Sequence, residues 1–120
     1  MRIIARQGMI RMDLKTQYKS KLLSAIPVVS AMKVDIIKIG IREITLTAPL
    51  DTNINYEGTA FGGSLYCVGA MTGWSALHLT LMDAGHLPSV WLAKGEVAYL
   101  KPVRGTLRAR TTITDEQRHR

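Results

Sequence analysis

The chain has 120 residues, of which 47% are apolar and 21% charged. This composition excludes a disordered chain and indicates one globular domain, just long enough for a single core. The only cysteine, Cys67, excludes an intramolecular disulfide and fits a reducing compartment. Arginines interrupt the first residues where a secretory signal would be apolar, so we expect a cytoplasmic protein.

The net charge of +7 raises the question of nucleic-acid binding. Much of the excess lies at the ends of the chain, because residues 1–21 hold six basic residues against one acid and two arginines lie in the last three positions. Between the ends the basic residues are scattered, and no basic, aromatic-rich strand offers a stacking surface. A solvated basic surface is therefore favoured over a nucleic-acid interface.

The first element predicted is an amphipathic helix over residues 13–26. Its apolar positions recur every four residues, at Leu14, Tyr18, Leu22 and Ile26. Asp13 is a candidate N-cap or first-turn acid, and Pro27 ends or kinks the helix. Residues 1–12 are interpreted as an N-terminal extension of doubtful role ahead of a domain over residues 13–120.

Two strands are predicted next, over residues 33–39 and 41–48, after a short helical turn at residues 30–32. Both are rich in β-branched residues, and Gly40 joins them. In the second strand apolar residues alternate with threonines, which indicates one buried face and one wetter face.

Residues 64–82 form a run of nineteen residues without a formal charge. Such a run is long enough to span a membrane. Its polar members argue instead for a fully buried central helix: Ser64, Thr72, Ser75, His78 and Thr80. Gly69 and Gly73 are expected to let a sheet approach the helix closely, and Asp83, Gly85 and Pro88 mark its end.

Two further strands are predicted over residues 90–100 and 106–114. Long strands after a buried helix indicate that the sheet wraps around that helix. The predicted fold class is α+β, an antiparallel sheet around one long central helix.

The loop from Asn53 to Tyr66, NINYEGTAFGGSLY, and the run YLKPV at residues 99–103 resemble motifs of the hot-dog thioesterase superfamily. The sequence is most similar to the thioesterase domain of the YiiD C-terminal type, over residues 20–114. Further matching positions are Ile26-Pro27, Ala31-Met32 and Gly73-Trp74. The resemblance implies a hot-dog fold and an acyl-CoA thioesterase, or a degraded relative that binds an acyl thioester.

For the site, the resemblance implies that the backbone amides of Gly62 and Gly63 hold the thioester carbonyl. Glycine permits close approach there, and a helix N-terminus stabilises negative charge on the oxygen. Ser64 is expected to assist by capping or hydrogen bonding. Asn55 is expected to orient water or substrate, the alternative being that both loop asparagines form Asx-turns with their own backbone.

The remaining residues assigned to substrate binding are Asn53, Gly58, Phe61, Tyr99, Lys101 and Arg104. Lys101 and Arg104 are candidates to pair with coenzyme A phosphates, or they simply solvate a turn. Coenzyme A is expected as part of the substrate, with no separate cofactor. The three scattered histidines and one cysteine have no zinc spacing, and Cys67 is interpreted as a small buried side chain rather than a nucleophile.

Two departures from the family bear on catalysis. Many relatives have histidine where this chain has Phe61, and many have a carboxylate base in the central helix, whereas residues 62–82 contain none. Any carboxylate must come from elsewhere, the candidates being Asp51, Glu57 and Glu96. Each of these is more simply a solvated surface charge.

The family pattern continues beyond Thr114 with at least two further strands, and we expect this domain to lack them or to receive them from another chain. An unpaired sheet edge and a helix apolar nearly all round favour a homo-oligomer, at least a dimer, with a site shared between subunits. Neither a membrane nor nucleic acid is favoured as a partner. The alternative function is a non-catalytic basic domain that binds an acidic partner or nucleic acid.

Overall fold

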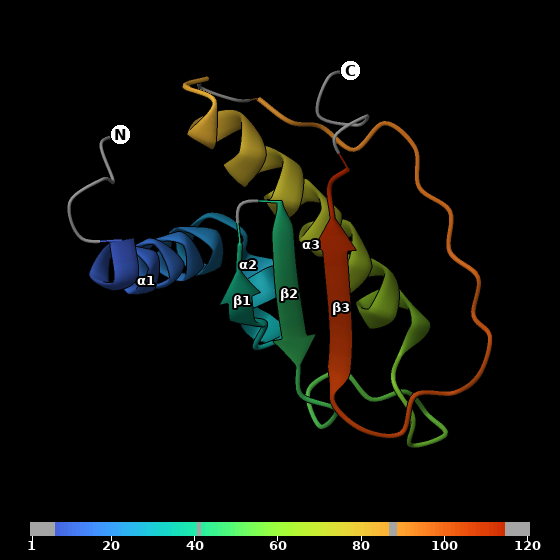
Figure 1. The fold of residues 1–120 in the computed structure, drawn as a ribbon. Coiled ribbons are helices and arrows are strands. Elements are labelled where there is room, and N and C mark those ends of the chain that lie inside the picture. The colour runs from blue at the N-terminus through green and yellow to red at the C-terminus, as the bar shows by residue number, and fades with distance from the viewer. Residues whose placement is uncertain (1–6, 41, 87–88, 115–120) are drawn as a thin grey trace.

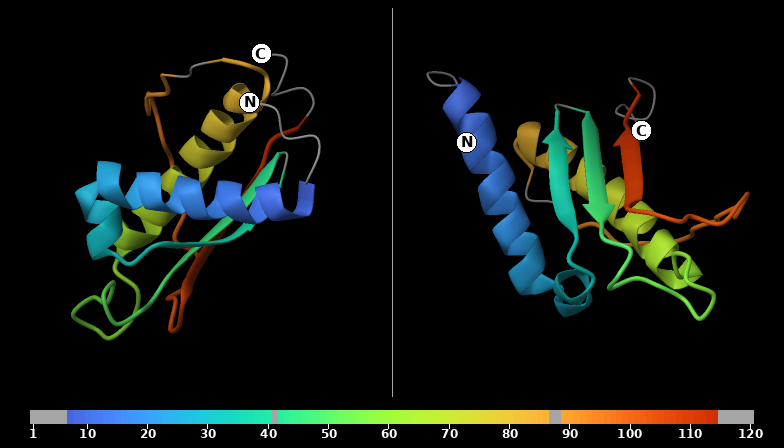
Figure 2. Two further views of the ribbon diagram at one scale, coloured as in Figure 1. Left: turned by 90° about the vertical axis from the view of Figure 1, so that its left-hand side faces the viewer. Right: turned by 90° about the horizontal axis from the view of Figure 1, so that it is seen from below.

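The structure is a computed structural model that describes residues 7–40, 42–86 and 89–114. Its elements in chain order are α1 (Gln7–Ala25), α2 (Pro27–Ala31), β1 (Asp35–Ile39), β2 (Glu43–Ala48), α3 (Gly62–Asp83) and β3 (Leu107–Thr112). A three-stranded sheet packs one face against α3. Helix α1 lies beside β1, at the edge of the sheet opposite β3 (Figure 1). Figure 2 shows the same two layers from the side and from below.

The first helix is longer than predicted. It begins at Gln7, six residues before Asp13, so the expectation that Asp13 caps the helix is wrong. Residues 7–12 contain no proline that would separate them from the helical pattern that follows, and they extend the helix. The chain turns at Pro27, which lies at the start of α2, where its missing N–H leaves no helical bond unmade.

The sheet has the order β1-β2-β3, with both pairs antiparallel. Because side chains alternate along a strand, Ile44, Leu46 and Ala48 of β2 share one face with Leu107 and Ala109 of β3. The three β2 residues and Leu107 are fully buried, and this face packs against α3. Strands are thereby confirmed within residues 33–39, 41–48 and 106–114, and the buried faces predicted for the last two are correct. The wetter face expected for residues 41–48 is wrong at Thr45, which is 1% exposed.

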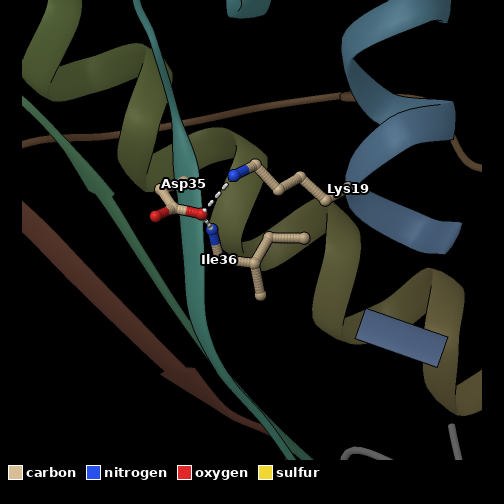
Figure 3. A network of polar contacts seen from close by, with 3 residues as sticks. All are labelled: Lys19, Asp35 and Ile36. Atoms are coloured by element: carbon tan, nitrogen blue, oxygen red, sulfur yellow. Dashed lines mark hydrogen bonds and ion pairs between the residues drawn. The ribbon is translucent and has the colours of Figure 1, made fainter. Parts of the chain in front are cut away.

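One ion pair joins α1 to the sheet (Figure 3). Lys19 Nζ lies 2.8 Å from Asp35 Oδ1, and the backbone N–H of Ile36 donates to the same oxygen at 2.8 Å. The hydrogen bond from Lys19 lowers the pKa of Asp35 below its ordinary value, against a smaller opposing effect of burial. Both charged side chains are 40–50% exposed, so the pair adds little stability.

The central helix predicted from the uncharged run at residues 64–82 is confirmed as α3, but it is buried on one side only within a single chain. The buried residues are Ser64, Val68, Thr72, Ser75, Ala76, Leu79 and Thr80. A Cβ at Gly69 or Gly73 would meet nothing within 4 Å, so the expectation that these glycines admit the sheet is wrong. Small hydroxyl residues line the sheet-facing side instead, and Thr80 bonds the carbonyl of Ala76 at 2.7 Å. No helix within the described residues is long and apolar enough to cross a membrane.

Residues 89–101, here called the return segment, lead from α3 back toward the start of β3 (Figure 1). A strand was predicted over residues 90–100, and this is wrong: the segment has no strand and every residue from 91 to 100 is exposed. Three contacts attach it to α3. The indole N–H of Trp74 donates to the Val90 carbonyl at 2.9 Å, and the Tyr99 hydroxyl donates to the Gly62 carbonyl at 2.9 Å. Between them, Gly95 passes so close to the Tyr66 hydroxyl that a Cβ would collide with it.

Candidate active site

The loop before α3 is anchored by Asn53, whose side chain is 2% exposed. Its Nδ2 donates to the carbonyls of Met32 at 2.9 Å and Pro49 at 2.8 Å. Its backbone carbonyl accepts the N–H of Phe61 at 2.7 Å, across the loop. Its Oδ1 is buried without a hydrogen-bond partner among the described residues. This side chain binds other segments of the chain rather than projecting toward solvent.

Asn55 is turned toward its own loop. Its Oδ1 accepts the backbone N–H groups of Glu57 at 2.9 Å and Thr59 at 3.0 Å, which is the pattern of an Asx-turn. Its Nδ2 donates to Thr59 Oγ1 at 2.8 Å. Gly58 lies inside this turn with a φ of 82°, a conformation that glycine adopts without strain.

The loop ends at Phe61, the residue before α3, whose extended backbone (φ −64°, ψ 130°) is followed directly by the helix. The first bond across this boundary runs from the N–H of Leu65 to the carbonyl of Phe61, at 3.0 Å. The amides of Gly62, Gly63 and Ser64 lie before this first bond, so they have no acceptor within the helix, and no side chain caps them. They form a short row of donors at the positive end of the helix dipole.

Two aromatic rings lie beside these donors, each more than half exposed: Phe61 at 54% and Tyr99 at 56%. A Cβ at Gly63 would lie 2.5 Å from Cε2 of Phe61, whereas a Cβ at Gly62 would lie 3.5 Å from the Tyr99 ring. The structure thus brings together four of the residues assigned to the site, which come from the loop, α3 and the return segment.

The turn over residues 101–105 lies next to the loop, because the N–H of Ala60 donates to the Val103 carbonyl at 2.8 Å. Lys101 and Arg104 stand on this turn, and both are exposed. Within the described part of the chain neither makes a hydrogen bond or an ion pair, so both charges are available to an anion.

The candidate carboxylates are dispersed. Asp51 and Glu57 are exposed in the loop, and Glu96 lies on the return segment with its side chain 84% exposed, 3.8 Å from Lys94. Helix α3 has no acid before Asp83. The described residues contain no group of histidine, cysteine and acidic side chains able to hold a metal ion.

Two other titratable side chains lie on α3, Cys67 five residues after Gly62 and His78 further along the helix. Burial raises the pKa of Cys67, which keeps it a neutral thiol. His78 lies sixteen residues after Gly62 on α3, about 24 Å along the axis. Its ring stacks on Trp74 with centroids 4.6 Å apart, and Nδ1 is 3.4 Å from the Tyr18 hydroxyl. Burial lowers the pKa of His78, and Lys21 lowers it further.

Comparison with known proteins identifies the family of this chain. A family model described as "Putative thioesterase (yiiD_Cterm)" matches residues 15–120. The chain belongs to this family. The predicted resemblance is confirmed, and with it the hot-dog fold, although three strands rather than four are present in the described residues.

Two crystal structures are similar to this thioesterase-family chain. One is of a protein "with unknown function" from Chlorobaculum tepidum TLS, 31% identical with a TM-score of 0.77, covering 92% of this chain and 65% of that one. The other is a "putative thioesterase" from Shewanella oneidensis, 28% identical with a TM-score of 0.81, covering 86% of this chain and 72% of that one. The chain therefore spans about two thirds of the length of these proteins. No curated protein matches the sequence significantly.

The sequence did not reveal two contributors to the site. The Met32 carbonyl accepts a hydrogen bond from the Asn53 side-chain amide, and the Val103 carbonyl accepts one from the N–H of Ala60. Both act through the backbone, so no side-chain pattern could have identified them. Only their presence within the family-like stretches Ala31-Met32 and residues 99–103 pointed to them.

Proposed function

We propose that this protein hydrolyses acyl thioesters and that its substrate is an acyl-CoA. The observation that carries the proposal is the uncapped start of α3, where the amides of Gly62 and Gly63 have no intrahelical partner and lie beside two exposed aromatic rings. Such amides suit an oxygen that gains negative charge during acyl transfer. Membership of the thioesterase family supports the same chemistry.

In the proposed reaction, the thioester carbonyl oxygen accepts hydrogen bonds from the Gly62 and Gly63 amides. Water attacks the carbonyl carbon, a carboxylate accepts the proton from water, and the carbon–sulfur bond breaks. The sulfur leaves with the electron pair and takes up a proton to give free coenzyme A, while the acyl group leaves as a carboxylic acid. Coenzyme A thus enters as part of the substrate, and no resident cofactor takes part.

The other site residues have supporting roles in this proposal. Phe61 and Tyr99 flank the thioester, and Ser64, whose side chain is buried, contributes its backbone amide at the third helical position. Lys101 and Arg104 bind the phosphates of coenzyme A, for which a pair of exposed, unpaired cations is suited.

The carboxylate is proposed to come from a second copy of the chain. Helix α3 supplies none near its start, and Glu57 and Glu96 are both exposed and open to a partner. The return segment also exposes large apolar side chains, Trp91 at 85%, Leu92 at 64% and Leu100 at 90%. A homo-oligomer, at least a dimer, would cover these side chains and build the site between subunits.

The test compares two substitutions at one position. Gly62→Pro removes the amide hydrogen at the first helical residue, where proline is tolerated, and Phe61 already has the extended backbone that a following proline requires. Gly62→Ala keeps the hydrogen and serves as the matched control. With a panel of acyl-CoAs of different chain length, we expect Gly62→Pro to lower kcat by about a hundredfold with an unchanged melting temperature.

Gly62→Ala should stay much closer to wild type than Gly62→Pro, because it keeps the amide hydrogen and its Cβ makes only an ordinary contact with the Tyr99 ring. Asn55→Ala should lower kcat if the loop amide orients water or substrate. Equal activity of the proline and alanine variants would refute the role of the Gly62 amide. A wild-type protein that hydrolyses no member of the panel, and whose melting temperature coenzyme A does not raise, would refute the thioesterase proposal as a whole.

A further inference from the structure

Asn53 connects three parts of the chain that meet at the start of α3. Its side-chain amide binds the Met32 carbonyl at the end of α2 and the Pro49 carbonyl after β2. Its backbone N–H donates to the Leu50 carbonyl at 2.9 Å, and its backbone carbonyl accepts the N–H of Phe61 at 2.7 Å. Phe61 is the residue from which α3 begins.

We infer that Asn53 is a positioning residue: it fixes the amides of Gly62 and Gly63 by tying the loop that carries Phe61 to the end of α2. The inference rests on the proposed function. The side chain is 2% exposed, so it acts through the loop and does not touch a substrate at the helix start.

Asparagine suits this place because two carbonyl oxygens face its amide and need two hydrogens from one small group. A carbonyl left without a donor away from water is costly, which gives most weight to the bond to Pro49, since the Met32 carbonyl also accepts the Thr52 hydroxyl at 3.2 Å. Aspartate has the same shape but, when ionised, offers only hydrogen-bond acceptors, so its carboxylate would be repelled by both carbonyl oxygens. Alanine removes the donors and the volume together. The two variants therefore separate hydrogen bonding from filling of space.

Amide hydrogen exchange measured by NMR on the full chain tests the inference without reference to activity. In Asn53→Ala and Asn53→Asp, we expect the protection of the Phe61 amide to fall about tenfold or more, while that of Thr72 in the middle of α3 stays within about twofold. Thr52→Val is the matched control. It removes a second donor to the Met32 carbonyl, at 3.2 Å, and an acceptor that lies 3.1 Å from Asn53 Nδ2. It leaves the bonds from Asn53 to the Met32 and Pro49 carbonyls in place, so Phe61 should stay protected.

Unchanged protection of Phe61 in Asn53→Asp, or an equal loss at Thr72, would overturn the inference. The first result would mean that volume suffices, and the second that the variant only destabilises the whole domain. If Asn53→Ala does not fold, Asn53→Ser, which keeps one donor, replaces it with the same local fall expected.

Kinetics then separate the inference from the proposed function. Misplaced donors weaken transition-state binding, so kcat of Asn53→Asp should fall about tenfold or more with KM changed less than about twofold. A rise in KM at constant kcat would overturn positioning in favour of substrate binding. An inactive wild type would refute the thioesterase proposal, and the exchange measurement would still decide whether Asn53 orders the start of α3.

Discussion

Two neighbouring glycines at the start of α3 should respond differently to alanine. Gly62 and Gly63 both lack the positive φ found at Gly58 and Gly85, so their backbone accepts a side chain. Their surroundings differ. A Cβ at Gly62 makes an ordinary contact of 3.5 Å with the Tyr99 ring, whereas at Gly63 it would approach Phe61 to 2.5 Å at Cε2 and 3.0 Å at Cζ.

The magnitude follows from two opposing effects. Replacing glycine by alanine at a compatible position stabilises a protein by about 0.4–1 kcal/mol, because the unfolded chain loses freedom. At Gly63 the Phe61 ring must move, and an off-rotamer side chain costs about 0.5–1.5 kcal/mol. We therefore expect Gly62→Ala to stabilise by about 0.7 kcal/mol and Gly63→Ala to have no net effect or a small loss. For a chain of this size the difference corresponds to about 3–6 °C in melting temperature.

Thermal unfolding followed by circular dichroism measures this difference directly. The matched control repeats Gly63→Ala in a Phe61→Ala background, where the obstacle is gone and the gain should equal that of Gly62→Ala. If Gly63→Ala is as stabilising as Gly62→Ala in the presence of Phe61, the packing of the ring over the helix start is refuted.

Two further predictions concern stability and assembly. The pKa of His78 is lowered in the folded chain, mainly by burial, so the unfolded chain binds its proton first and the free energy of unfolding should fall as the pH drops below about 6.5. Urea unfolding at about pH 7.5 and about pH 5.5 should show this decrease in wild type and a smaller one in His78→Gln; equal decreases would contradict it. Light scattering at micromolar concentration should give at least twice the chain mass of 13.3 kDa, and a well-folded monomer would contradict both the oligomer and the shared site.

The central helix and the strand periods could be predicted from the sequence because their signals are local. An uncharged run bounded by Gly62 and Asp83 leaves little room for another element, and the alternation along residues 106–114 determines which side chains face α3. The N-terminal boundary of α1 was missed because no cap or breaker marks it, and helix ends are set by tertiary contacts as much as by local preference.

The return segment shows what a strand pattern requires beyond its own residues. Residues 90–100 have the composition of a strand, but a strand is stable only when a neighbour pairs with its backbone. Within the described residues β3 pairs with β2 alone, and the return segment is held by side chains of α3 and by Tyr99 instead of by a ladder. Its sequence therefore favours a strand, but no strand in the described residues pairs with its backbone.

The two loop asparagines make the same point for the site. Asn53 and Asn55 are identical residues two positions apart, and the resemblance assigned the orienting role to Asn55 and only substrate binding to Asn53. The structure separates them by their partners: those of Asn55 lie within five residues, whereas Asn53 reaches Met32, twenty-one residues away. The local bonds of Asn55 stabilise a turn, whereas the distant bond of Asn53 connects the loop to the rest of the fold. The residue that best explains how the donors at Gly62 and Gly63 are held in place is thus the one whose role depends on the tertiary structure.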